Sequence, residues 1–280
     1  MKIKIKKMIS IIILLLFALF IEQLLFGSLL PYSPVFFGFN KSENEKVIIY
    51  YHKDLYLDID KVTNIIAETE DFHELPYKNK TKIILTKSES EFYRYTFSKF
   101  RFLTVKNRIL VSGRNIKDNQ NNKIHIYTYL KHELSHSLIY QNMSSIQFIQ
   151  NTVPGWLLEG IATYSSGMIG QDSYYSKEDV FKTINNGIFI NPIDWKSGFL
   201  VSESPTVRDF PLSGNEKYFF IYSELGCVIE DLILRYGKDL FIDYMKKSMV
   251  DKDNESVFYS VYGIKYESYI LQFQEMVLAN

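Results

Sequence analysis

The pentapeptide His132-Glu-Leu-Ser-His136 sets the strictest condition on how this chain folds. Two histidines four positions apart lie on one face of a helix, about one turn apart, so both imidazoles can reach one metal ion. Apolar residues at Ile126, Leu130, Leu134 and Leu138 have the spacing of a helix with one buried side. We therefore expect a half-buried helix here, and a second element that brings a third ligand to the same point.

That third ligand is predicted at Glu159. It lies in an apolar segment, residues 156–164 (Trp-Leu-Leu-Glu-Gly-Ile-Ala-Thr-Tyr), which is expected to be a helix with Pro154 in its first turn and Gly167 as its left-handed stop. An unpaired carboxylate is costly to bury in such a segment, and metal binding removes that cost. Two alternatives stay open: Glu159 as an exposed glutamate favoured by the helix dipole, and the histidines as ordinary half-buried residues.

Two histidines and a glutamate are a typical ligand set for Zn²⁺. A zinc ion with three protein ligands keeps a fourth position for water, and it lowers the pKa of that water to about 7. Glu133 lies directly beside the first histidine and is expected to be the general base that activates the zinc-bound water. We therefore predict a zinc hydrolase with His132, His136 and Glu159 as metal ligands and Glu133 as a catalytic residue.

The two motifs together resemble those of the gluzincins, zinc peptidases whose ligands are the two histidines of HExxH and a glutamate on a following helix. Residues 156–164 are similar to the W-L-x-E-G-x-A-x-Y segment of that clan, including its aminopeptidase branch. The interval between His136 and Glu159 is longer than in the aminopeptidases, and the sequence has no G-x-M-E-N segment. The likeness to that branch is therefore limited to the two motifs.

A wider likeness, from about Val47 to the C-terminus, is to the bacterial "peptidase MA-like" proteins. It extends over residues 82–92, 222–237 and 261–269. The resemblance implies an α+β, zincin-like metallopeptidase domain, with a small sheet ahead of the HExxH helix and a helical lobe behind it, acting on a peptide or protein substrate. The zinc would lie between these halves, where an edge strand can pair with an extended peptide.

The resemblance also implies two supporting groups. A tyrosine or histidine from a later helix donates a hydrogen bond to the developing oxyanion, and Tyr222 falls where the family has a tyrosine; a purely packing role for this aromatic ring is the alternative. Thermolysin-like enzymes place an aspartate one turn after the glutamate ligand. Here that position is Thr163, so the group that orients the ligating histidines is its hydroxyl or another group that the sequence does not identify.

The N-terminus predicts membrane attachment. Four lysines within residues 2–7 precede a long apolar run over residues 8–21, with more apolar residues up to position 30. A basic flank before such a run is held in the cytoplasm while the following chain is exported. We expect a signal anchor or transmembrane segment over residues 1–30, a tether over 31–46 and an extracytoplasmic catalytic domain over 47–280; secretion after signal cleavage is the alternative.

Within that domain, strands are expected at residues 47–51 and 82–86, with a helix at 59–69 between them and extended structure at 102–111. The edge strand is assigned to residues 108–112, with 102–105 as the rival. Further helices are expected at 216–235, 238–248, 255–261 and 266–278. Residues 171–212 are expected to line one rim of the cleft between the sheet and the helical lobe.

Composition narrows the classes of function. Zero net charge with mixed signs argues against a nucleic-acid partner, and a single cysteine, Cys227, excludes an intrachain disulfide. The leading hypothesis is thus a membrane-anchored zinc metallopeptidase. One alternative is a catalytically silent zincin-fold binding or scaffold protein. Another is an intramembrane protease, which is less compatible with the polar residues around His132. The oligomeric state is not indicated by the sequence.

Overall fold

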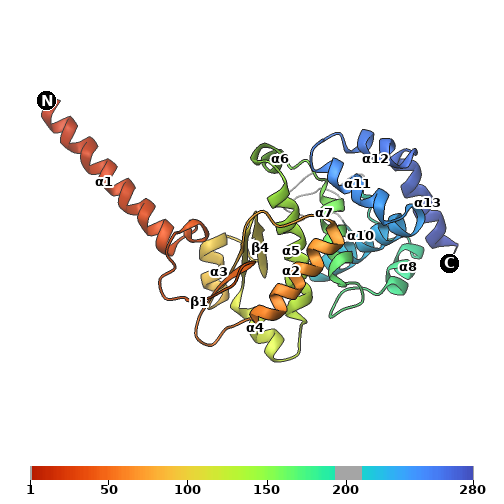
Figure 1. The fold of residues 1–280 in the computed structure, drawn as a ribbon, viewed down its shortest axis with the longest axis horizontal. Helices are drawn as coiled ribbons and strands as arrows, with labels where there is room; N and C mark the ends of the chain where they lie inside the picture. The colour runs from red at the N-terminus through yellow and green to blue at the C-terminus, as the bar shows by residue number, and fades with distance from the viewer. Residues whose placement is uncertain (1, 193–209, 280) are drawn as a thin grey trace.

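The computed structural model describes residues 2–192 and 210–279, and within them the chain is an α+β fold with one small mixed sheet and twelve α-helices. Helix α1 (Lys2–Phe26) projects from a body whose sheet lies near it and whose C-terminal helices lie at the far end (Figure 1). The expected fold class is confirmed at this level: a small sheet ahead of a helical half, preceded by an apolar N-terminal helix.

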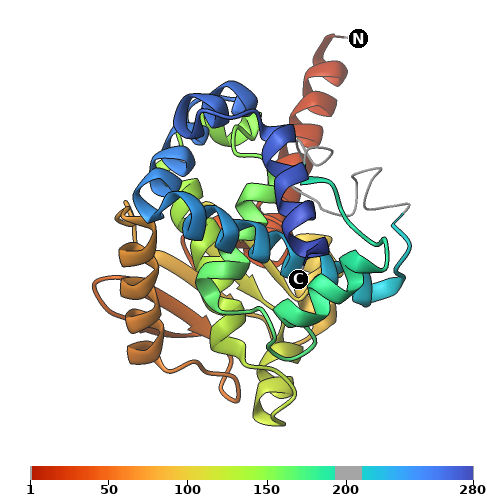
Figure 2. The ribbon, with the colours of Figure 1, turned by 90° about the vertical axis from the view of Figure 1, so that its right-hand side faces the viewer.

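The helices after α1 fall into two groups, one beside the sheet and one behind it. The first group comprises α2 (Ile59–His73), α3 (Glu89–Thr96), α4 (Gly113–Gln120) and α5 (Ile126–Asn142). The second comprises α6 (Ser145–Gln150), α7 (Gly155–Ser166), α8 (Lys177–Asn185), α10 (Gly214–Tyr236), α11 (Lys238–Ser248), α12 (Asn254–Tyr262) and α13 (Tyr266–Leu278). Figure 2 looks at the molecule from the side of the second group. The four C-terminal helices expected from the sequence are confirmed as α10 to α13.

The sheet has five strands in the order β1-β2-β3-β5-β4. They are β1 (Asn40–Glu43), β2 (Val47–Tyr51), β3 (Thr81–Leu85), β4 (Phe102–Val105) and β5 (Arg108–Val111). The central strands β2, β3 and β5 run parallel, while β1 and β4 pair antiparallel at the two edges. The strands expected at residues 47–51 and 82–86 are confirmed as β2 and β3.

The edge strand next to the helical half is β4, so the assignment of the edge to residues 108–112 is wrong and the rival, residues 102–105, is right. The reason is a tight hairpin. Lys106 adopts a left-handed conformation (φ 51°) in the two-residue connection between Val105 and Arg108, as the favoured short hairpin turns require. The chain folds back on itself there, and β5 enters the sheet between β4 and β3.

Alternate side chains of the central strands enter two separate cores, as the two-residue period of a strand requires. One face packs against α2 and α5 through residues that include Ile49, Ile83 and Ile109. The other face packs Ile84 and Leu110 against α3 and the segment that follows α1. Because both faces are covered, the parallel strands are mainly apolar, and the polar residues of β3 and β5 lie at the starts of these strands.

Residues 31–46, predicted to be a tether, are instead part of the folded body. Leu30 and Phe36 are buried against the sheet, and the ring of Phe36 stacks on Tyr50 at 3.9 Å. The Arg108 guanidinium donates a hydrogen bond to the Pro31 carbonyl (2.8 Å), and β1 pairs with β2. The body therefore begins before Val47 and is joined closely to the end of α1.

The second group of helices has its own core, in which α10 is buried along much of its length. Helix α7 contacts both α5 and α10, so it lies between the sheet half and the C-terminal helices. The stretch 171–212 contains α8, while its residues 193–209 lie outside the described part of the chain.

Candidate metal centre

Helix α5 carries the two histidines, and polar contacts fix it to its surroundings. Buried His73 of α2 bonds through Nε2 to the Ser135 hydroxyl (2.8 Å) and through Nδ1 to the Thr69 carbonyl (2.8 Å). The Tyr77 hydroxyl donates to the Leu134 carbonyl (2.7 Å). These bonds join α5 to α2 and to the segment that follows α2.

Helix α7 carries Glu159; it ends at Gly167 as predicted, and it begins one residue later than predicted. Pro154 is the residue before its first turn, and Gly167 closes it in the left-handed conformation (φ 72°). Gly160 permits close approach to α10, because a Cβ there would lie 2.8 Å from Ile229 Cγ1 and 2.9 Å from the Leu225 carbonyl oxygen. The absence of a side chain at Gly160 thus places the neighbouring Glu159 at a fixed depth between α5 and α10.

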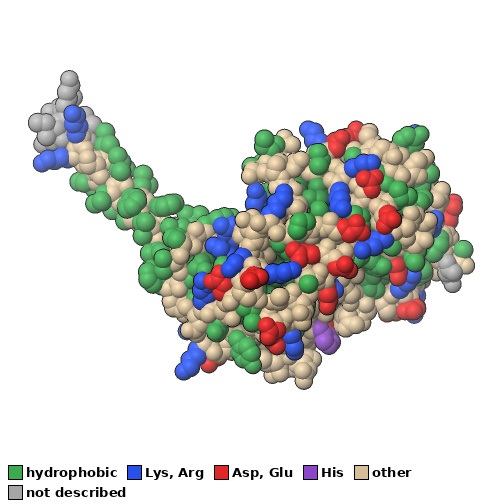
Figure 3. All heavy atoms as spheres, in the orientation of Figure 1, with side chains coloured by type: hydrophobic (Ala, Val, Ile, Leu, Met, Phe, Trp, Pro, Cys, Tyr) green, Lys and Arg blue, Asp and Glu red, His purple; other side chains and the backbone are tan. Residues whose placement is uncertain are grey.

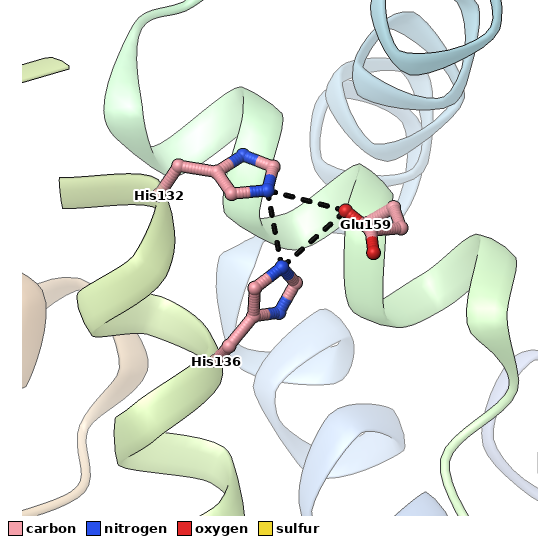
Figure 4. Close-up of side chains that lie close together, drawn as sticks. All are labelled: His132, His136 and Glu159. Carbon is pink, nitrogen blue, oxygen red and sulfur yellow. Dashed lines mark hydrogen bonds and ion pairs between the residues drawn. The ribbon is translucent and has the colours of Figure 1, made fainter. Parts of the chain in front are cut away.

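The three predicted ligands point at one another (Figure 4). His132 Nε2 lies 3.0 Å from His136 Nε2 and 3.1 Å from Glu159 Oε2, and the third distance, between His136 Nε2 and Glu159 Oε2, is 3.3 Å. Both histidines are buried and Glu159 is nearly so. This is the one group of three or more His, Cys, Asp or Glu side chains in ranges 2–192 and 210–279 with the spacing to hold a metal ion.

The donor set fits zinc. Ligand bonds of about 2.1 Å in a tetrahedral arrangement place ligand atoms about 3.4 Å apart, and the three observed distances are within a few tenths of an ångström of that value. The second nitrogen of each imidazole ring is buried without a partner: neither His132 Nδ1 nor His136 Nδ1 makes a hydrogen bond to any described residue. The same holds for Thr163 Oγ1, so the hydroxyl expected to orient a ligating histidine does not do so here.

The charges of the three side chains depend on one another. Burial raises the pKa of Glu159, but the adjacent imidazoles more than offset this and hold the pKa of this carboxyl well below its ordinary value. Burial lowers the pKa of His136, and the Glu159 carboxylate outweighs it, so the pKa is raised. Glu159 is therefore a carboxylate in a place where burial alone would protonate it.

Glu133 is the neighbour of this trio, half-buried on α5, and its partner comes from the edge strand. The Thr104 hydroxyl of β4 donates a hydrogen bond to Glu133 Oε2 (2.5 Å). The same strand edge is held to α5 by the Ser137 hydroxyl, which donates to the Lys106 carbonyl (2.7 Å). Sequence reasoning did not identify Thr104, although the rival edge-strand assignment would have brought it near the motif.

Tyr222 of α10 lies beside the trio, its ring centroid 6.0 Å from that of His132. Tyr174, which the sequence did not single out, stacks beside it with centroids 6.4 Å apart. Burial, followed by nearby groups that include Glu159 and Glu133, raises the pKa of both phenols well above their ordinary value. Both hydroxyls therefore stay protonated at neutral pH and are available as donors.

The loop that presents Tyr174 is tied to the start of α5. The Asp172 carboxylate accepts hydrogen bonds from the His125 backbone N–H (2.9 Å) and from His125 Nδ1 (2.6 Å). His125 and His73 thus make contacts that position α5, and neither joins the metal group.

Neither the protein-family models nor the curated proteins compared with this chain give a match.

Proposed function

We propose that this chain is a membrane-anchored, extracytoplasmic zinc metallopeptidase of the gluzincin type, with a zincin-like arrangement of sheet and helices. The observation that carries the proposal is the convergence of His132 Nε2, His136 Nε2 and Glu159 Oε2, with Glu133 beside them. Two imidazoles and one carboxylate are the ligand set of a catalytic rather than a structural zinc site.

A zinc ion bound there would polarise the scissile carbonyl and make a water molecule acidic at neutral pH. Glu133 accepts the proton of the attacking water and returns it to the departing amine. Thr104 holds the Glu133 carboxylate through its hydroxyl, so the base stays beside β4. Tyr222 or Tyr174 donates a hydrogen bond to the oxyanion that forms as the carbonyl is attacked.

The edge of β4 supports a peptide as the substrate. In an antiparallel pair, residues alternate between those that bond to the partner strand and those that do not. Ser112 N–H donates to the Arg101 carbonyl across the β4–β5 pair. Phe102 and Thr104 therefore direct their backbone groups away from β5, to the edge where no strand pairs within the described residues. An extended peptide bound along that edge passes beside Glu133.

The anchor is proposed from α1. Its segment Lys6–Phe26 is long and apolar enough to cross a membrane, a test that a signal sequence also passes, and none of it is buried against the body. Retention of α1 with the lysines inside gives a single-pass protein with its catalytic half outside. If the mature chain begins after position 26 and is absent from the membrane fraction, then α1 is a cleaved signal sequence and not an anchor.

The test of the peptidase uses the full chain purified in a mild detergent. We expect about one zinc per chain and cleavage of an unfolded protein such as casein. Glu133→Gln should keep the zinc and lose the cleavage, whereas Glu68→Gln, on the exposed surface of α2, should keep both.

Zinc bound without cleavage of any peptide library would favour a silent binding or scaffold protein. A chain without zinc, or cleavage that survives Glu133→Gln, contradicts the proposal.

A further inference from the structure

Exposed aromatic side chains gather near the base of α1. Outside α1, five of the seven exposed aromatic residues in the described chain belong to two short segments, residues 32–37 and 93–100. Together with one exposed valine they are Tyr32, Val35, Phe37, Tyr93, Phe97 and Phe100. Monomeric soluble proteins seldom leave such side chains clustered in water, so a contiguous patch of them marks an interaction surface.

The two segments belong to one surface because they share a core beneath it. Phe36 of the first segment and Phe92 and Tyr95 of α3 are buried in the same hydrophobic cluster on the outer face of the sheet. The exposed Phe37 reaches back to α1, where its ring lies 6.3 Å from that of Phe26. Figure 3 shows apolar side chains continuing from α1 onto the adjoining part of the body.

The charge of this surface is one-sided. Residues 26–39 contain no charged side chain, and residues 92–101 contain three basic residues and no acidic one. Arg94 and Lys99 are exposed. The acidic side chains of α3 have partners: Glu89 pairs with Arg114 (2.7 Å), and Glu91 accepts from the Tyr95 hydroxyl (2.9 Å). Exposed aromatic rings mixed with basic side chains are typical of the interface between water and lipid.

The joint between α1 and the body is short. The backbone N–H groups of Gly27 and Leu29 both bond to the Gln23 carbonyl (3.0 and 3.1 Å), and Leu30 is already buried against the sheet. A bilayer that contains α1 therefore ends close to residues 32–37.

We propose that the side chains of Tyr32, Val35, Phe37, Tyr93, Arg94, Phe97, Lys99 and Phe100, which we call the interfacial surface, bind the surface of the bilayer that α1 spans. The basic residues contact anionic headgroups and the aromatic rings enter the interfacial layer. The inference rests on the membrane anchoring in the proposed function, and it is independent of peptidase activity. If the interfacial surface binds lipid, the folded body lies against the membrane and does not move freely on a flexible tether.

The test uses the full chain in vesicles of phosphatidylcholine and phosphatidylglycerol, at less than one protein per vesicle. A fluorescent label is placed on a cysteine at Phe37, at Phe97 or, as the control, at Tyr259, which is exposed to the same extent as Phe37 (57%) but lies on α12 at the far end of the body (Figure 1). The native Cys227 does not interfere, because burial raises the pKa of its thiol to about 12.

We expect quenching by lipid-borne nitroxide at positions 37 and 97 and not at 259, and the reverse order for iodide dissolved in the water. Arg94→Glu combined with Lys99→Glu should weaken the lipid contact at position 97 while the chain still floats with the vesicles.

Equal iodide quenching at all three positions, in a chain that floats with the vesicles, overturns this inference alone. A chain that does not float overturns the anchor as well. Protection that appears only at many proteins per vesicle identifies a second copy as the occupant, and it also overturns the assignment to lipid.

Discussion

His73 should make the stability of this protein fall steeply in mild acid. The side chain is fully buried, and burial lowers its pKa from 6.5 to about 4, despite the opposing hydrogen bond to the Thr69 carbonyl. The unfolded chain therefore binds this proton before the folded chain does. The stabilisation is present above pH 6.5 and is lost as the pH falls toward 4.

The magnitude follows from the shift. A difference of 2.5 pKa units, from 6.5 to 4, corresponds to about 3 kcal/mol in full and to about 2 kcal/mol already at pH 5. The matched variant is His73→Gln, whose amide does not titrate and whose oxygen stays an acceptor for the Ser135 hydroxyl. Carboxylates and histidines that do not interact with His73 titrate alike in both proteins, so they cancel in the difference.

The assay is urea denaturation of both proteins in non-ionic detergent with a chelator, at several values between pH 7.5 and pH 5. We expect the free energy of unfolding of the wild type to fall by about 2 kcal/mol more than that of His73→Gln over this interval. Parallel curves would refute the reasoning, since they would mean that His73 binds a proton in the folded protein as easily as in the unfolded one.

Five other changes test the site. Thr104→Val removes the hydrogen bond to Glu133 and should lower kcat/KM about tenfold with zinc content unchanged, as measured with a peptide substrate. Tyr222→Phe should lower kcat by about 10²–10³ and Tyr174→Phe much less; the opposite order would assign the oxyanion donor to Tyr174. Gly160→Ala should cost about 1–3 kcal/mol of unfolding free energy, because its Cβ meets the backbone of α10. Removal of zinc with a chelator should lower the melting temperature, and zinc added back in excess should restore it.

The sequence predicted the central strands and the long helices because these carry strong side-chain patterns. Residues 47–51 are apolar and β-branched or aromatic, as a covered parallel strand requires. The helical spacing of apolar residues predicted α5 but understated its burial, because residues 134–141 are buried on every side of the helix. The sequence failed to predict β1, whose residues Asn-Lys-Ser-Glu are polar and largely exposed. That strand is held by backbone pairing with β2, and backbone pairing leaves no signature in the side chains. The prolines at 31 and 34 then made the segment resemble a linker.

The same distinction applies to the candidate site. His132, His136 and Glu159 were predicted because a helix fixes the spacing of the first two and because a buried glutamate needs a partner. Thr104 and Tyr174 were missed because each reaches the site from a separate part of the chain, where no spacing rule connects it to the motif. Which hydroxyl meets Glu133 depends on the hairpin that makes β4 the edge strand.

The three predicted ligands are placed by the packing of their helices. Within the described residues the ring Nε2 atoms of His132 and His136 bond only inside the trio, and their Nδ1 atoms have no partner. The backbone of α5 is held by the bond from His73 of α2 to Ser135. The backbone of α7 is held by the close contact of Gly160 with α10. A shift of α7 by a few tenths of an ångström would move the Glu159 carboxylate by as much. Gly160→Ala should therefore weaken zinc binding as well as the fold, although Gly160 offers no ligand atom.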